Sequence, residues 1–427
     1  MQWSRITLLC AGLLAVATPA TAYSVLTHEA IIDTTWDVGI RPILVRRFGS
    51  SAAALREARA YAYGGSIVQD MGYYPLSSRT FGDLAHYVRS GDFVLTMIRQ
   101  ARTMNELAFA LGALAHYTAD NYGHPIGINR AVPLMFPKVA AKYGSPVTYE
   151  DHPMSHLRTE FGFDVVQIAR GRYLPASYHD FIGFQVSKPL LSRAFKATYS
   201  LELDDVFGNV DMAIATFRWS VGSVLPTLTK AAWAASQDRI KSTEPGRQPE
   251  VMPFTYSRRE HEEVWGTGDR KPGLGHRVLG WVLRIVPKFG PFKAAAFKTP
   301  TPEAERLFLE SFDRVVFEYR QRLSALSRDA LTLPDRNFDT GQPIRAGDYR
   351  LVDEALADLV NRLAARQFAG VTPALRARIL AFYADRDAPV ATKADRKDWQ
   401  ELTVNLAALR AQGQTPSAGA TVKSDGP

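Results

Sequence analysis

The chain has 427 residues, a net charge of +8 from 51 Lys and Arg against 43 Asp and Glu, and one cysteine. This length allows a large hydrophobic core and favours more than one domain. One cysteine excludes a disulfide framework and a thiolate-rich metal site, so any metal needs His, Asp, Glu or backbone ligands. The positive charge favours anionic partners such as phospholipid surfaces or nucleic acid, though only weakly.

The first 22 residues have the features of a secretory signal peptide. Arg5 precedes the apolar run ITLLCAGLLAVA, and the small residues Ala20 and Ala22 form an A-x-A site. This pattern predicts cleavage after Ala22, a mature chain that starts at Tyr23, and export to the periplasm or the medium. The apolar run is short for a membrane-spanning helix, so retention as an anchor is disfavoured. Cys10 lies in this segment, so the mature chain would contain no cysteine.

Helical periodicity dominates the rest of the chain. Residues 83–123 predict consecutive helices with interruptions near Ser90–Asp92 and Thr103–Asn105, ending before Pro125. Residues 130–153 contain four prolines and predict an irregular excursion. No strand pattern is evident, so the sequence predicts an all-α fold. Further helices are expected from Pro153, through 210–235 with a kink at Pro226, over 301–327 and within 348–411.

Composition divides the chain into five parts. A stretch rich in Pro, Gly, Lys and Arg separates two helical regions, and the polar Gly/Pro/Ser-rich end is expected to be disordered. Within the separating stretch, 277–298 mixes Trp, Phe and Leu with Lys and Arg, which favours a buried connection over a helix at a membrane interface. The assigned parts are 1–22 (signal peptide), 23–237 (first helical domain), 238–302 (linker or lid), 303–411 (helical C-terminal region) and 412–427 (tail).

The stretch LAHYTADNYGHP, residues 114–125, places His116, Asp120 and His124 at four-residue intervals. This spacing puts side chains on one helical face, and two imidazoles with a carboxylate are typical metal ligands. A buried hydrogen bond between His116 and Asp120 would explain those two residues equally well.

Other candidate ligands precede and follow this motif. His156 and Glu160 repeat the four-residue spacing, although an ordinary surface pair would have the same spacing. Six of the 9 histidines lie between positions 28 and 156. Together with Asp70 these residues outnumber the four ligands of one structural zinc site, which indicates a cluster of several ions.

Five motifs, THEA, QDMGYYP, LAHYVRSGDF, HYTADNYGHP and HLRTE, resemble the zinc-dependent phospholipase C family over about residues 23–235. That family is related to the fungal single-strand-specific nucleases, with which it shares a helical fold and a three-zinc site. The resemblance implies that 23–237 is the catalytic domain. It also implies that the mature N-terminal residue binds zinc through its amine and carbonyl oxygen. Tyr23 stands where the family commonly has Trp.

The resemblance implies a ligand set for each of three zinc ions. It also implies that Asp70 acts as the general base, and a role as ligand alone is an equally open interpretation. The implied ligands are Asp70, His86, His116 and Asp120 for the first ion; Tyr23, His28 and the bridging Asp120 for the second; and His124, His156 and Glu160 for the third.

The implied activity is that of an exported zinc-dependent phosphodiesterase that hydrolyses phospholipids with metal-activated water. The spacing between Asp120 and His124 is shorter than in many bacterial phospholipases C and resembles the glycosylphosphatidylinositol-specific phospholipase D branch. The headgroup and the bond cleaved therefore stay open. A single-strand-type zinc nuclease and a zinc-stabilised, non-catalytic secreted binding module are the alternatives. If the protein is a phospholipase, we expect peripheral contact with a membrane. Nucleic acid is an expected partner only if the protein is a nuclease. No oligomeric state is predicted.

Overall fold

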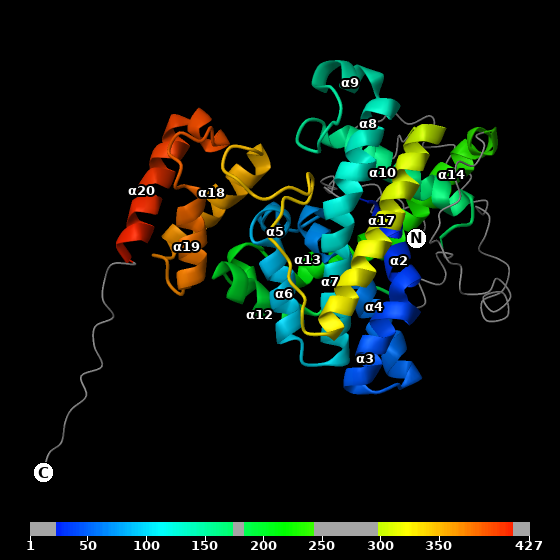
Figure 1. Cartoon of the computed structure of the whole chain (residues 1–427), viewed down its shortest axis with the longest axis horizontal. Coiled ribbons are helices and arrows are strands. Elements are labelled where there is room, and N and C mark those ends of the chain that lie inside the picture. Colours follow the sequence, from blue (N-terminus) through cyan, green and yellow to red (C-terminus); the bar gives the residue numbers. More distant parts are fainter. Residues whose placement is uncertain (1–22, 174–182, 243–297, 413–427) are drawn as a thin grey trace, which may run out of the picture.

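The computed structural model describes residues 23–173, 183–242 and 298–412, and most of these residues lie in helices (Figure 1). An isolated β-bridge joins Arg336 and Pro343, and no strand is present within the described ranges. The all-α prediction is confirmed. The signal segment, almost all of the linker with its 277–298 stretch, and the tail lie outside the described residues.

The helices of the first region follow one another with short connections. Between α5 and α6, Arg89 adopts a left-handed conformation with φ 52°, and Thr103 caps α7 by accepting the Glu106 N–H. Both interruptions therefore fall within two residues of where the sequence predicts them. The elements are α2 (Val25–Thr35), η1 (Trp36–Ile40), α3 (Arg41–Phe48), α4 (Ala52–Gly65), η2 (Val68–Tyr73), α5 (Arg79–Tyr87), α6 (Ser90–Gln100), α7 (Met104–Gly123), η3 (His124–Ile128), α8 (Asn129–Met135), α9 (Pro137–Tyr143) and α10 (Pro153–Ala169).

The second half of the chain is also helical. Pro226 is the second residue of α14, directly after a π-helical turn, which agrees with the predicted kink. α17 begins at a cap in which Thr301 accepts the Ala304 N–H. The elements are α12 (Lys188–Tyr199), η4 (Leu203–Asp205), α13 (Val210–Trp219), η5 (Ser220–Val224), α14 (Leu225–Ser242), α17 (Pro302–Ser327), α18 (Arg350–Ala365), α19 (Pro373–Phe382), η7 (Ala391–Ala394) and α20 (Arg396–Gln412).

Two local predictions were wrong. The expected excursion over 130–153 begins with two short helices, α8 and α9, because Pro137 takes the first position of α9, where a missing N–H costs nothing. The prediction that the helix ends before Pro125 was also wrong, because helical backbone continues through Pro125 into α8. The backbone widens there into the π-helical turn η3, in which Asn129 donates its N–H to the His124 carbonyl.

α7 is the central helix of the larger part of the molecule. It contacts α2, α4, α6 and α17, and α17 runs beside it in Figure 1. α4 approaches α7 closely because both carry glycine at the crossing: a Cβ on Gly65 would lie 2.0 Å from the Phe109 carbonyl oxygen, and one on Gly112 would lie 2.2 Å from that of Ala62. This close approach brings the end of α4 to the face of α7 that carries His116.

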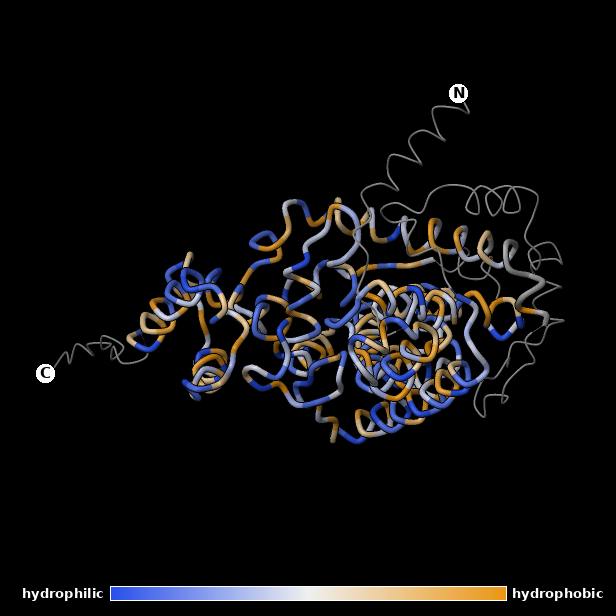
Figure 2. Tube along the Cα trace, turned by 90° about the horizontal axis from the view of Figure 1, so that it is seen from above, coloured by the Kyte–Doolittle hydropathy of each residue, from blue (hydrophilic) through white to orange (hydrophobic). Residues whose placement is uncertain are grey.

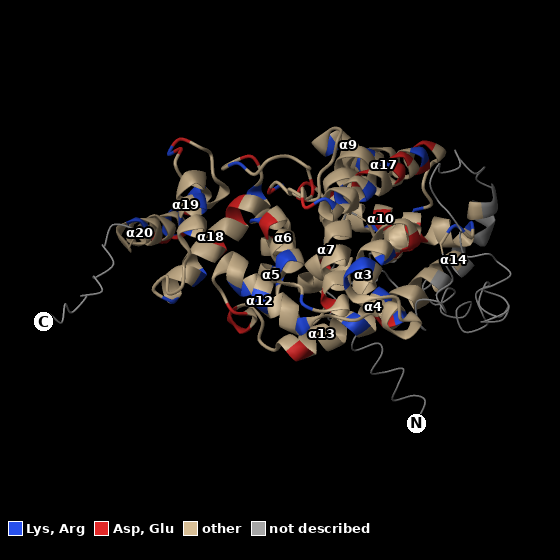
Figure 3. Cartoon of the chain, turned by 60° about the horizontal axis from the view of Figure 1, so that its bottom comes forward, with Lys and Arg blue, Asp and Glu red and all other residues tan. Residues whose placement is uncertain are grey.

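α5, α6 and α18 are amphipathic, whereas nearly every residue of α2 and α7 is buried. Hydrophobic and hydrophilic residues alternate along the tube in Figure 2, and no helix within the described ranges is long and apolar enough to cross a membrane. Lys and Arg lie interspersed with Asp and Glu over the face seen in Figure 3. The charge distribution of this face therefore gives no argument for a strongly anionic partner.

Candidate metal centre

Three elements bring imidazoles and carboxylates together on one face of α7. α7 supplies His116 and Asp120, η2 supplies Asp70, and the last turn of α5 supplies His86. The His86 Nε2 atom lies 3.2 Å from Oδ1 of Asp70 and 3.6 Å from Oδ2 of Asp120. The His116 Nε2 atom lies 3.2 Å from the same Asp120 oxygen and 3.9 Å from the same Asp70 oxygen.

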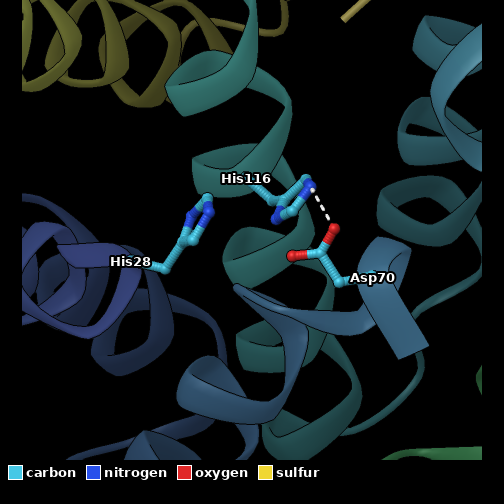
Figure 4. Close-up of side chains that lie close together, drawn as sticks. All are labelled: His28, Asp70 and His116. Carbon is cyan, nitrogen blue, oxygen red and sulfur yellow. Dashed lines mark ion pairs between the residues drawn. The ribbon is translucent and has the colours of Figure 1, made fainter. Parts of the chain in front are cut away.

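His28 of α2 approaches Asp120 at its other oxygen. Its Nε2 atom is 3.8 Å from Oδ1 of Asp120, whereas His86 and His116 face Oδ2. The His28 ring stacks on that of His116 with centroids 4.5 Å apart, and Asp70 lies beyond His116 (Figure 4). The two oxygens of Asp120 thus face different histidines, an arrangement in which one carboxylate can be shared by two ions.

Backbone carbonyls orient two of these rings. The Nδ1 atom of His86 lies 2.7 Å from the Gly82 carbonyl oxygen, and that of His116 lies 2.9 Å from the Ser66 carbonyl oxygen. A carbonyl only accepts, so Nδ1 carries the proton and the neutral ring presents its Nε2 lone pair to the centre. Metal-binding histidines characteristically have such a partner on the other nitrogen.

The converging atoms have no hydrogen-bond partner although they are buried. They are the carboxylate oxygens of Asp70 and Asp120, the Nε2 atoms of His86 and His116, and both ring nitrogens of His28. An unsatisfied buried polar group costs about 1–3 kcal/mol, so several of them at one place indicate a missing ligand rather than ordinary core packing. Nitrogen and carboxylate oxygen are the donors that zinc accepts in the absence of thiolates.

Burial and neighbouring charges act against each other on the pKa values of these groups. Burial lowers the pKa of His116, but the charges of Asp120 and Asp70 outweigh burial and raise it to about 9. Burial raises the pKa of Asp120, but His116 outweighs it and lowers the value to about 2. Burial raises the pKa of Asp70, against the opposing effects of His116 and His86. Without a metal, the proton on His116 compensates the buried carboxylates.

A second set of side chains meets where α7 runs into η3. His156 and Glu160 lie one turn apart on α10, with His156 Nδ1 3.9 Å from Glu160 Oε1. His156 donates from Nε2 to the Val147 carbonyl oxygen at 2.7 Å, so its Nδ1 presents a lone pair. His124, the first residue of η3, completes a group whose ligand atoms all lie within 4.8 Å of one another. Burial lowers the pKa of both histidines to about 4, which favours the neutral, ligating form.

Tyr23 lies next to these groups. Its ring centroid is 6.0 Å from that of His28 and 5.5 Å from that of Phe308 in α17. The nine residues predicted from the sequence are therefore brought together, and none is more than 4 % exposed. Separations of 3.2–3.9 Å between donor atoms suit a central ion, because metal–ligand distances of about 2.0–2.2 Å place neighbouring ligands somewhat over 3 Å apart.

Two side chains between α17 and α18 also face the centre, and the sequence analysis missed them. Phe338 covers the rings of His86 and His116, with centroids 5.3 and 6.0 Å apart. Asp339 places Oδ1 3.1 Å from the His124 Nδ1 atom. Both lie in a stretch, LPDRNFDTGQP, whose Pro, Gly and Asp residues indicate only a loop.

Comparison with known proteins gives a match for the segment that carries most of this centre. Residues 27–209 match the family model described as zinc dependent phospholipase C. This segment covers less than half of the 427-residue chain and contains eight of the nine predicted residues, all except Tyr23. No curated protein and no solved structure matches the chain.

Proposed function

We propose that the protein is an exported zinc-dependent phosphodiesterase of the phospholipase C type, acting on phospholipids. The observation that supports this most strongly is the convergence of buried, partnerless imidazoles and carboxylates in a segment that matches the model of this family. Phospholipid is the substrate class that the family implies. Export rests on the sequence of residues 1–22 alone, and contact with a membrane surface follows from the substrate.

Three zinc ions are proposed, as the resemblance to the family implies. The groups of side chains with the spacing to hold a metal are His28, Asp70 and His116; His86, His116 and Asp120, which overlap the first group at His116; and His124, His156 and Glu160. Asp120 is proposed to be shared between two ions because its oxygens face different histidines. The proposed ligands are Asp70, His86, His116 and Asp120; Tyr23, His28 and Asp120; and His124, His156 and Glu160.

Bound zinc would lower the pKa of water towards ~7 and neutralise charge on the phosphate oxygens. Asp70 is the proposed general base, which takes the proton of the attacking water at a carboxylate oxygen. A carboxylate beside the attacking water has an oxygen free to accept its proton. The Gly82 carbonyl fixes the ring of His86, whose Nε2 atom lies 3.2 Å from Oδ1 of Asp70.

The experiment that tests this function is product analysis by mass spectrometry. A chain beginning at Tyr23 is incubated with mixed phospholipid vesicles and, separately, with single-stranded DNA, each with and without a chelator. We expect diacylglycerol from the vesicles, and no product with the chelator. An Asp70→Asn variant with unchanged zinc content should lose most of the activity, whereas full activity would remove Asp70 as the base.

The other outcomes decide between the alternatives. Phosphatidic acid would indicate D-type cleavage, and nucleotides with intact lipids would indicate a nuclease. Absence of products from both substrates, with three zinc ions bound, would favour the zinc-stabilised binding module. A zinc content well below three ions per chain would contradict the proposed metal centre itself.

A further inference from the structure

We infer that Asp339 is a fourth protein ligand of the ion proposed to be held by His124, His156 and Glu160. This inference rests on the proposed function, because it requires that ion to bind. Asp339 lies outside residues 27–209, the segment that matches the family model. The C-terminal region would thus complete a metal site that begins in the family segment.

The contact between Asp339 and His124 carries the inference. Asp339 Oδ1 and His124 Nδ1 lie 3.1 Å apart, yet neither atom has a hydrogen-bond partner. Asp339 is 2 % exposed and His124 4 % exposed, so water does not compensate either atom. With the His124 proton on Nε2, both facing atoms are electron-rich and repel each other unless a cation lies beside both. Their separation is that of neighbouring ligands on one ion.

The other polar atoms of Asp339 all form hydrogen bonds within the protein. Its Oδ2 atom accepts the Tyr149 N–H at 2.8 Å and the Tyr349 hydroxyl. Its own N–H donates to Asn337 Oδ1 at 2.9 Å, and its carbonyl oxygen accepts from the Asn129 side chain at 2.8 Å. These bonds fix the carboxylate so that Oδ1 alone is left to face His124, which is how outer partners orient a metal ligand.

A fourth protein ligand changes what this ion can do. Zinc sites with four protein ligands are closed, whereas catalytic sites keep a position for water or substrate. The ion beside Asp339 would therefore hold α10, η3 and the segment before α18 together. Hydrolysis would then take place at the ions that share Asp120.

Zinc retention in matched variants tests the inference. Asp339→Asn keeps the size of the side chain, and its amide oxygen can still accept from Tyr149 and Tyr349, but it presents an NH2 group to the ion. After dialysis against a chelator, we expect one zinc fewer per chain, or release of that zinc accelerated by more than roughly 100-fold. Loss of an outer partner typically weakens metal affinity by only about 10–100-fold. Tyr349→Phe is the control, because it removes the hydroxyl that donates to Oδ2 and accepts the Glu150 N–H but leaves Oδ1 in place. Its zinc release should accelerate by no more than roughly 100-fold.

A thiolate at the same position distinguishes a direct bond from an outer contact. Asp339→Cys is made in a chain carrying Cys10→Ser, so that it contains no other thiol. After loading with Co²⁺, we expect a thiolate-to-cobalt charge-transfer band in the near-ultraviolet, absent from the Cys10→Ser parent. A variant that binds cobalt without this band, together with unaltered zinc retention in Asp339→Asn, would overturn the inference.

Failure of this inference is distinguishable from failure of the proposed function. If the unmodified chain binds no zinc, the proposed metal centre is wrong. If it binds three zinc ions and Asp339→Asn retains all three against the chelator as firmly, only the role of Asp339 is wrong.

Discussion

The phenol oxygen of Tyr23 lies 2.6 Å from the hydroxyl oxygen of Ser311, which is 288 residues further along the chain. Ser311 donates its own proton to the Phe308 carbonyl oxygen at 2.7 Å, so the phenol donates to Ser311. Burial raises the pKa of Tyr23 well above the usual range, which keeps the phenol protonated for this bond. α17 thereby holds the residue that is predicted to begin the mature chain.

A double-mutant cycle measures this contact. We expect Tyr23→Phe and Ser311→Ala each to lower the free energy of unfolding, and the pair to couple by about 1 kcal/mol, the net worth of a typical buried hydrogen bond. Denaturant unfolding of the metal-free chain provides the four stabilities. A cycle that pairs Tyr23→Phe with Thr403→Ala on α20 should be additive. Additivity in the Tyr23–Ser311 cycle would show that α17 does not hold Tyr23 through this bond.

Extending the chain by one residue before Tyr23 tests the proposed amine ligand. An added alanine moves the free amine away from His28 and leaves an amide nitrogen, which is a poor zinc ligand, in its place. We expect one zinc fewer per chain and a loss of phospholipid hydrolysis of 100-fold or more. Zinc analysis of the extended and unextended chains checks the first point. Full zinc content and full activity in the extended chain would remove Tyr23 from the site.

Gly123, the last residue of α7, packs directly against the Tyr23 ring. A Cβ at this position would lie 2.7 Å from the Cζ atom of Tyr23, so Gly123→Ala must displace the ring. We expect a stability loss of about 1–3 kcal/mol and weaker zinc binding next to His28. Gly208→Ala is the matched control, because a Cβ there has no neighbour within 4 Å. Equal behaviour of the two variants would mean that the Tyr23 ring shifts freely.

Much of the fold was predictable because its signals are local. The helical periodicity of 83–123, its interruption near Thr103 and the kink at Pro226 all act within a few residues. The four-residue spacing of His116 and Asp120 likewise required only that α7 be a helix. That both residues face Asp70 and His86 depends on long-range packing, and here the resemblance to a family, not periodicity, provided the prediction.

The contribution of the C-terminal region was not predictable in the same way. Ser311 is one serine among many on an amphipathic helix, and Asp339 lies in a turn-rich stretch with no regular spacing. Their roles arise from contacts that span more than 180 residues, such as Asn129 with the Asp339 carbonyl oxygen. Single-sequence patterns do not encode such pairings.

Asp164 connects α10 to the start of α2 and should make stability depend on pH. Its carboxylate accepts the Leu26 N–H at 3.0 Å and the Thr27 hydroxyl at 2.7 Å, which fixes the turn before His28. Burial raises the pKa of Asp164 from 3.8 to about 7, against the opposing hydrogen bonds from Thr27, Ser24 and Leu26 and with a small addition from Glu29.

The sign of the effect follows from proton binding. Between pH 4 and 7 the folded chain retains the Asp164 proton while the unfolded chain has released it, so the free energy of unfolding falls as pH rises through this window. We expect this contribution to reach up to about 4 kcal/mol above pH 7, and Asp164→Asn to lack it. Denaturant unfolding of both metal-free proteins from pH 4 to 8 measures the difference in slope. The exposed Asp204→Asn should follow the unmodified chain; if Asp164→Asn follows it too, the Asp164 carboxyl titrates alike in the folded and unfolded states.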